Sequence, residues 1–294
     1  MSVRIAIVAD IHHGRPSATK RGDRALALME SFAAFADDAR PDLVLDLGDR
    51  ISDEDAETDA RLAAEAADAF RAVTAPRAHL DGNHDRDHLS AAQNDALLGR
   101  EGGSETLDIG GWRIALWRAD PKIHRGNGAG RRGFALPEPD LLWLSRVAQA
   151  ADRPLLVVSH VPVSGHAQTG NYYFERNPSA STYPEAARAR AALAQARVPV
   201  LCLAGHVHWN TVTTVDGIAH LTQQSLTESF TTEGEAAGAM GLLELGDGVA
   251  RWRVEGLDPF EATLRPTARR WTPPLPPFDT VRGLRPETDP EAAA

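Results

Sequence analysis

The chain has 294 residues, of which 43% are hydrophobic and 24% are charged, and its formal net charge is −10. This composition is typical of a globular protein with one large core or two small ones, and no apolar run reaches the ~20 residues of a membrane-spanning helix. Surfaces that bind nucleic acid are usually basic, so we expect no nucleic acid as the main partner. Without a long apolar run we also expect no membrane partner.

Short apolar runs alternate with amphipathic, alanine-rich segments through the first two thirds of the chain. The apolar runs predict strands at residues 3–9, 42–47, 77–80, 106–109, 112–117, 154–159 and 201–204. The segments between them predict helices at residues 23–40, 53–73, 89–98, 140–150 and 184–196. A run of antiparallel strands follows, at residues 211–215, 218–223, 241–245 and 249–254. This order predicts α/β layers with mixed sheets.

The two ends of the chain differ in character. The first residues predict a buried strand and not a signal peptide, and Cys202 is the only cysteine, so we expect a cytoplasmic protein without an intrachain disulfide. From residue 257 onward the chain holds 8 of its 19 prolines, which excludes a regular helix or a central strand there. We therefore expect one folded domain over residues 1–256 and a proline-rich tail over residues 257–294, either an extended strap or a partly disordered end.

Five of the predicted strands end in a carboxylate, an amide or an imidazole. These residues are Asp10, His12, Asp49, Asn83, His160, His206 and His208. Ligands of open α/β sheets bind at the carboxyl ends of the strands, so the fold would bring these side chains to one edge. Seven nitrogen and oxygen donors are too many for one tetrahedral ion, and they suit two metal ions that share a bridging carboxylate.

Each of these signals has a simpler explanation when it is taken alone. Asp10 could cap a helix, residues 81–85 have the composition of a turn, and the two histidines of the Gly-His-Val-His motif at 205–208 could mark the exit of a strand to solvent. Side chains at i and i+2 of a strand point to one side, so these two histidines could also converge on one point. The coincidence of five strand ends favours the metal site.

In this order the motifs resemble those of the calcineurin-like metallophosphoesterases. The matching residues are Asp10-x-His12, Gly48-Asp49, Gly82-Asn83-His84-Asp85, His160 and Gly205-His206-Val207-His208. They span residues 10–208, about two thirds of the chain. The resemblance implies a four-layer α/β/β/α sandwich with two mixed β-sheets, and a catalytic domain over residues 1–256. Bacterial class III cyclic-nucleotide phosphodiesterases are similar in length and keep the same Gly-Asn-His-Asp and Gly-His-x-His motifs.

The resemblance also implies a role for each matching residue. Asp10, His12 and His208 would bind one metal ion, Asn83, His160 and His206 the other, and Asp49 would bridge them. His84 would contact the phosphate and protonate the leaving group. Asp85 would have an orienting role and would not bind a metal ion. The ions would be manganese, iron or zinc, and a hydroxide held by the metal pair would attack phosphorus.

The expected activity is that of a binuclear metal-dependent phosphoester hydrolase. We favour a phosphodiesterase whose partner is a small-molecule phosphoester such as a nucleotide. The alternatives are a phosphomonoesterase, a nuclease of the recombination-repair kind, and a non-catalytic scaffold that keeps its metal site. Ser52 stands where many relatives have an acid three residues after the bridging aspartate, so the sequence does not predict the partner of His84.

Three further segments leave their roles open. The acidic run at residues 53–57 predicts a helix N-terminus that faces water, and His13 could line the pocket or lie at the surface. The loop at residues 118–132 could be solvated or could bind a second anionic group of the substrate through Lys122, His124, Arg125, Arg131 and Arg132. The loop at residues 161–183 could stack on a nucleobase or anchor itself to the core through His166, Tyr172, Tyr173 and Phe174.

Overall fold

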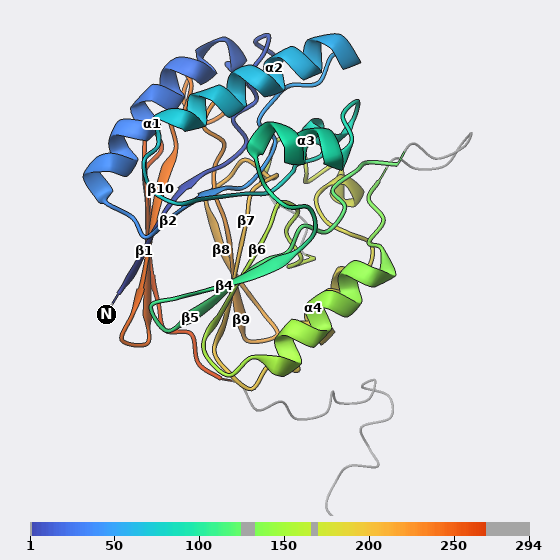
Figure 1. The fold of residues 1–294 in the computed structure, drawn as a ribbon, viewed down its shortest axis with the longest axis vertical. Helices are drawn as coiled ribbons and strands as arrows, with labels where there is room; N and C mark the ends of the chain where they lie inside the picture. The colour runs from blue at the N-terminus through green and yellow to red at the C-terminus, as the bar shows by residue number, and fades with distance from the viewer. Residues whose placement is uncertain (1, 125–132, 166–169, 269–294) are drawn as a thin grey trace, which may run out of the picture.

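Two six-stranded β-sheets pack face to face, with helices on both outer faces (Figure 1). The structure is a computed structural model, and it describes residues 2–124, 133–165 and 170–268. Both sheets are mixed, because each contains parallel and antiparallel neighbours. The predicted α/β/β/α sandwich is confirmed.

The first sheet has the strand order β12-β11-β10-β1-β2-β3. Its three parallel strands are β1 (Val3–Val8), β2 (Leu43–Asp46) and β3 (Arg77–His79). The antiparallel strands are β10 (Met240–Gly246), β11 (Val249–Glu255) and β12 (Phe260–Leu264). The helices on this side of the molecule are α1 (Ala25–Ala39), α2 (Ala56–Ala69) and α3 (Ala91–Leu98).

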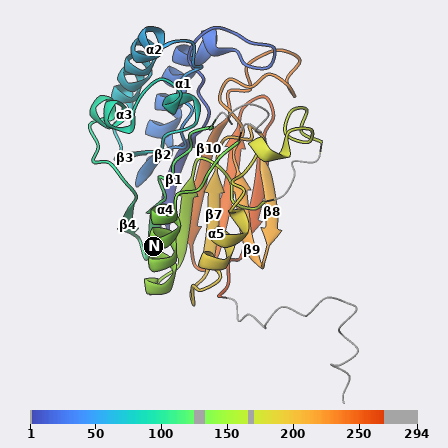
Figure 2. The ribbon, with the colours of Figure 1, turned by 90° about the vertical axis from the view of Figure 1, so that its right-hand side faces the viewer.

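The second sheet has the strand order β4-β5-β6-β7-β9-β8. Its strands are β4 (Glu105–Ile109), β5 (Trp112–Leu116), β6 (Leu155–Ser159), β7 (Val200–Ala204), β8 (Thr211–Val215) and β9 (Ile218–Thr222). Its outer face is covered by α4 (Glu138–Ala150) and α5 (Ala186–Leu193), as Figure 2 shows. Within the described ranges no helix is both long and apolar enough to cross a bilayer.

The main core lies between the two sheets, and β1 shows how the sequence builds it. Ile5 and Ile7 point into the space between the sheets, whereas Ala6 and Val8 point outward against α1. Because side chains alternate along a strand and both faces of β1 are covered, the strand is apolar without interruption from Ile5 to Val8. Packing of the strands in the core therefore fixes the position of each strand end and of the loop residues directly after it.

Most predicted strands are confirmed to within one or two residues, and two expectations are corrected. The helix predicted from residue 53 begins at Ala56, because the Asp55 side chain caps it by accepting the backbone N–H groups of Glu57 and Thr58. The four C-terminal strands do not form one continuous run: β8 and β9 extend the second sheet, while β10 and β11 belong to the first.

The first sheet continues beyond residue 257, where we expected the tail to begin. Strand β12 pairs with β11 at the edge of the sheet, and Pro259 and Pro266 flank it. This position fits the rule that proline is tolerated at strand ends and sheet edges. Residues 269–294, which hold most of the predicted tail, lie outside the described residues.

Replacing Leu45, which is fully buried between the sheets, should lower the free energy of unfolding of the protein. We expect Leu45→Ala to cost about 2–5 kcal/mol, since it removes buried apolar atoms and leaves a cavity. The matched control is Leu142→Ala on α4, where the side chain is 52% exposed and the change should stay within about 0.5 kcal/mol. Urea unfolding followed by circular dichroism measures both, and equal effects would contradict this assignment of the core.

Candidate metal centre

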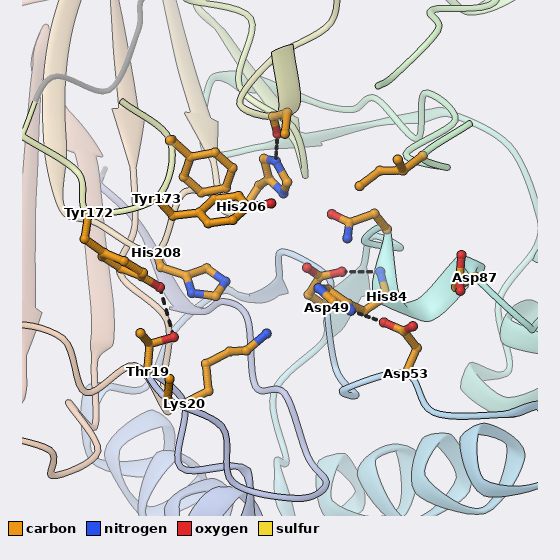
Figure 3. Close-up of a pocket in the computed structure, with 15 residues that line it drawn as sticks. Thr19, Lys20, Asp49, Asp53, His84, Asp87, Tyr172, Tyr173, His206 and His208 are labelled. Carbon is orange, nitrogen blue, oxygen red and sulfur yellow. Dashed lines mark hydrogen bonds and ion pairs between the residues drawn. The ribbon is translucent and has the colours of Figure 1, made fainter. Parts of the chain in front are cut away.

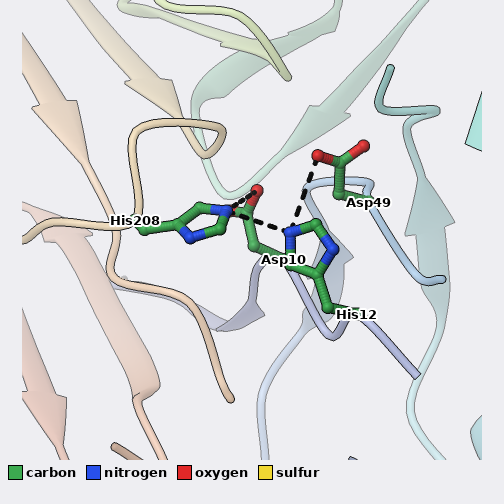
Figure 4. A group of neighbouring side chains, drawn as sticks. All are labelled: Asp10, His12, Asp49 and His208. Atoms are coloured by element: carbon green, nitrogen blue, oxygen red, sulfur yellow. Dashed lines mark hydrogen bonds and ion pairs between the residues drawn. The ribbon is translucent and has the colours of Figure 1, made fainter. Parts of the chain in front are cut away.

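The seven predicted ligands lie together at one end of the sandwich, in the loops that follow β1, β2, β3, β6 and β7. Asp10, His12, Asp49 and His208 form one cluster whose potential ligand atoms all lie within 4.8 Å of one another (Figure 4). A second cluster consists of Asp49, His160 and His206, also within 4.8 Å. The Asn83 Oδ1 atom lies 3.4 Å from His160 Nε2, which places Asn83 beside the second cluster. Asp49 belongs to both clusters.

Five of these residues have a left-handed backbone conformation. The φ angles are 52° for Asp10, 48° for His12, 57° for Asp49, 71° for His206 and 59° for His208. Such a conformation costs about 1–3 kcal/mol per residue, and Asp, Asn and His tolerate it better than most side chains. The chain therefore turns sharply after each strand and aims these side chains inward.

The two histidines of the Gly-His-Val-His motif do not converge on one point. His208 joins the first cluster and His206 joins the second. The expectation from strand alternation fails because β7 ends at Ala204 and the left-handed turns that follow replace the extended geometry. Two ligands one residue apart thus serve two different clusters.

Two glycines make room for the carboxylates of the centre. A Cβ atom on Gly205 would lie 2.7 Å from Asp10 Oδ2, and a Cβ atom on Gly82 would collide with the Asp49 side chain. The glycines of these motifs are therefore required by close packing against the aspartates.

Hydrogen bonds outside the clusters orient the imidazole rings. His160 Nδ1 lies 2.8 Å from the Leu47 carbonyl oxygen, and His208 Nδ1 lies 2.7 Å from Glu228 Oε2. These acceptors place a proton on Nδ1 and leave Nε2 available to a metal ion. Outer hydrogen bonds of this kind are typical of metal-binding histidines. No sequence motif indicated Glu228, whose side chain is completely buried.

The residues present fit two metal ions. His12 Nε2 lies 3.0 Å from His208 Nε2, and His208 Nε2 lies 3.4 Å from Asp10 Oδ1. On the other side, Asp49 Oδ2 lies 3.8 Å from His12 Nε2 and 3.4 Å from His160 Nε2. Two sets of nitrogen and oxygen donors thus converge around a shared carboxylate, and mixed donors of this type suit manganese, iron or zinc.

Burial and neighbouring charges together raise the pKa values of two of these histidines and lower that of a third. Burial alone would lower the pKa of His160, but the Asp49 carboxylate raises it to about 9. Burial opposes protonation of His208 in the same way, and Asp10 and Glu228 raise its pKa to about 9. Burial lowers the pKa of His206 to about 3, and the neighbouring His160 adds to this effect. His160, beside Asp49, and His208, beside Asp10, are therefore positively charged at neutral pH in the metal-free protein.

Asp53 is the partner of His84 that the sequence did not predict. The His84 Nδ1 atom is hydrogen-bonded to the Asp53 carboxylate, and the His84 backbone N–H donates to Asp49 Oδ1 at 2.8 Å. Burial would raise the pKa of Asp53, but the hydrogen bond from His84 lowers it. The expectation that the whole acidic run faces water is therefore wrong for Asp53. Since Asp55 caps α2, Asp53 precedes the helix and is free to turn toward His84.

Asp85 lies beneath the centre and not in the cavity. Its carboxylate accepts the backbone N–H groups of Asp49, Arg50 and Gly82 at 2.8–2.9 Å. The Arg50 guanidinium, only 1% exposed, lies 3.3 Å from the same carboxylate and 2.9 Å from Asp46. Asp85 therefore fastens the loop that carries Asp49 to the loop that carries Asn83. Arg50, which the sequence analysis passed over, supplies the countercharge.

A cavity of about 430 Å³ opens onto both clusters (Figure 3). Its polar side is formed by Asp49, Asp53, Asn83, His84, Asp87, His206 and His208. Its remaining lining consists of Ala18, Thr19, Lys20, Ile123, Tyr172, Tyr173, Phe174 and Ala180. Tyr172, Tyr173 and Phe174 of the 161–183 loop thus line the cavity.

The other residues predicted near the pocket lie elsewhere. His13 is not part of this lining, and its Nε2 atom lies 2.7 Å from Glu65 Oε2. Lys122 and His124 line an adjacent pocket that shares Asp87 and Ile123 with this cavity, and neither of them belongs to the cavity lining itself. Arg125, Arg131, Arg132 and His166 lie outside the described residues.

A family model described as calcineurin-like phosphoesterase matches residues 3–210. The chain belongs to the calcineurin-like phosphoesterase family. This match covers every predicted metal ligand, from Asp10 to His208. No curated protein matches this chain significantly in sequence.

Solved structures with similar folds include a dimetal phosphatase from Danio rerio. It is 16% identical, with a TM-score of 0.71, and the match covers 90% of this chain and 99% of that one. GAP50, the anchor in the inner membrane complex of Plasmodium, is 13% identical, with a TM-score of 0.51 and coverage of 92% and 90%. At these identities the likeness establishes the fold.

Metal binding to this phosphoesterase should release protons at neutral pH. Because the pKa values of His160 and His208 are about 9 without metal, each must lose a proton before its Nε2 atom can ligate. The affinity for Zn²⁺ should therefore rise about tenfold per pH unit at each site between pH 6.5 and 8. Isothermal titration calorimetry in two buffers of different protonation enthalpy counts the protons.

The same titration with His160→Gln should release one proton fewer than the unmodified protein. Equal proton release by both proteins would show that His160 is not protonated at neutral pH.

Proposed function

We propose that this family member is a binuclear metal-dependent phosphodiesterase acting on small molecules such as nucleotides. The observation that supports a diester is the charge of the cavity lining. Asp49, Asp53 and Asp87 contribute three carboxylates, and Lys20 is the one Lys or Arg side chain among the described lining residues. A phosphodiester carries one negative charge, so it is repelled less by these carboxylates than a phosphomonoester dianion would be.

The apolar lining favours a substrate with an organic group next to phosphorus. Tyr172, Tyr173 and Phe174 lie in the same cavity as the metal-binding side chains (Figure 3). Aromatic rings provide flat apolar surface on which a planar group such as a nucleobase can stack. Tyr173 is 47% exposed and therefore accessible to such a group.

In this proposal the two clusters hold the metal pair. Asp10, His12 and His208 would bind one ion, Asn83, His160 and His206 would bind the other, and Asp49 would contribute to both. When bound, the ions supply positive charge against the phosphoryl oxygens and lower the pKa of the attacking water. No serine or cysteine nucleophile is needed, which agrees with the burial of Cys202.

In this proposal His84 protonates the leaving oxygen. It lines the cavity, and its side chain is 30% exposed there. The hydrogen bond to Asp53 engages Nδ1 and orients the ring, so Nε2 remains available to the substrate. Asp85 supports this arrangement indirectly, by fixing the backbone of Asp49.

The Mn²⁺-loaded protein should hydrolyse bis(p-nitrophenyl) phosphate with a higher kcat/KM than p-nitrophenyl phosphate. His84→Ala should lower kcat for the diester about 100-fold or more, because it removes the proton donor. Release of p-nitrophenolate measures both. A preference for the monoester would support a phosphomonoesterase, and absence of turnover by either protein would support a non-catalytic scaffold.

Removing the charge of Asp53 should weaken catalysis without removing the metal ions. We expect Asp53→Asn to lower kcat for the diester about 10–100-fold, because the carboxylate that is hydrogen-bonded to His84 Nδ1 and orients the ring is lost. Metal content, measured by mass spectrometry, should stay at two ions per chain. Glu54→Gln is the matched control, since Glu54 adjoins Asp53 in the chain and its carboxylate pairs with Arg15. Equal activity of the two variants would remove Asp53 from the mechanism.

A further inference from the structure

Lysine is rare in this chain, and one of its lysines lies in the cavity. The sequence contains 31 Lys and Arg residues, of which only Lys20 and Lys122 are lysine. Lys20 lines the cavity, and Figure 3 shows its side chain extending toward the region between His208 and Asp49. None of the matched family motifs includes this residue.

We infer that Lys20 binds the phosphoryl group of the substrate and so positions it over the metal pair. This inference rests on the proposed phosphoesterase function and adds a substrate-binding residue to it. The ligand chemistry that Lys20 recognises is a phosphoryl oxygen, whether in a diester or in inorganic phosphate.

The backbone of Lys20 is fixed relative to the metal centre. Residues 19–21 lie in the loop between β1 and α1, and they are hydrogen-bonded to residues 227–229. The Arg21 N–H donates to the Thr227 carbonyl at 2.9 Å, and the Ser229 N–H donates to the Thr19 carbonyl at 2.7 Å. The same segment supplies Glu228, which orients His208. The base of the lysine side chain and the first cluster therefore share one rigid support.

The ammonium group has no carboxylate partner in the part of the chain that the structure describes. Among the described residues its hydrogen-bonding contact is with His12 Nδ1, which lies 3.4 Å from Nζ. Burial lowers the pKa of Lys20, and the carboxylates of Asp49, Glu228, Asp10 and Asp53 oppose this shift, yet none of them forms an ion pair with the ammonium among the described residues. An ammonium at the edge of a cavity with so few partners retains donors for a ligand.

Ligation of His12 would break the hydrogen bond between Lys20 and His12. His12 Nε2 faces His208 and Asp49, so this is the atom that would bind a metal ion. A neutral imidazole that ligates through Nε2 carries its proton on Nδ1, where it becomes a donor. It can then no longer accept a hydrogen bond from the ammonium. In the loaded protein the ammonium must therefore find another acceptor, and phosphoryl oxygens are the acceptors that the substrate brings.

Lysine suits this place better than arginine would. An ammonium is a compact charge with three donors on a flexible stem, whereas a guanidinium is a wide planar fork. With His84 also lining the cavity, the phosphoryl group would meet Lys20 and His84 as separate hydrogen-bond donors.

The first test measures binding of inorganic phosphate to the Zn²⁺-loaded protein by isothermal titration calorimetry. Lys20→Met should raise the dissociation constant at least tenfold while leaving the zinc content at two ions per chain. Lys20→Arg keeps the charge and should recover part of the affinity. Lys122→Met is the matched control and should bind phosphate as the unmodified protein does. Unchanged phosphate affinity of Lys20→Met would overturn the inference.

The second test observes Lys20 directly and needs no enzymatic turnover. Reductive methylation with ¹³C-formaldehyde labels the two lysines and the N-terminal amine, and Lys20→Arg and Lys122→Arg assign the lysine signals. In the Zn²⁺-loaded protein, phosphate should shift the Lys20 signal and leave that of Lys122 in place. If Lys20 responds but no phosphoester is hydrolysed, the inference stands and the proposed activity fails. If diesters are hydrolysed and Lys20 does not respond, the activity stands and the inference fails.

Discussion

The position of the Asp49 carboxylate is the constraint on which the rest of the centre depends. One of its oxygens faces His12 and His160, while the other accepts the backbone N–H of His84. It therefore joins both clusters and also fixes the segment that carries the proposed acid. Because β2 is buried on both faces, the end of this strand cannot move without disturbing the core on either side. The site is thus as rigid as the sandwich itself.

A buried ionic network supports Asp49 from below. The Arg50 guanidinium contacts Asp46, Asp81 and Asp85 at 2.8–3.3 Å, and the carbonyl of Leu80 accepts another of its hydrogen bonds. Several buried charges in one place are stable only when they are paired and hydrogen-bonded. Removal of one member would leave uncompensated charge next to the strand ends. This network links β2 to the loop after β3, so it determines the distance between Asp49 and Asn83.

Local signals in the sequence predicted the α/β layers with mixed sheets and the set of strand-end residues, and the family resemblance added the four-layer sandwich. Short apolar runs mark β1, β2, β6 and β7, and a polar residue after each run marks the end of the strand. Asp53, Glu228 and Lys20 could not be found in this way, since their roles follow from side-chain directions across long loops. Asp53 did leave one signal, because it lies a single position beyond the place where relatives carry an acid. For Glu228, nothing in the neighbouring sequence indicated a contact with His208.

The left-handed backbone at Asp10, His12, Asp49, His206 and His208 bears on how this family loses or keeps its activity. At these positions the fold itself disfavours β-branched and bulky side chains, whatever the chemistry of the site. A descendant that abandoned hydrolysis would remain under pressure to keep small polar or imidazole residues there. Asn83, with a φ of −68°, carries no such restriction, and His84 and His160 are absent from the left-handed set. In an inactive descendant we therefore expect substitutions at these three positions before substitutions at the five left-handed ones.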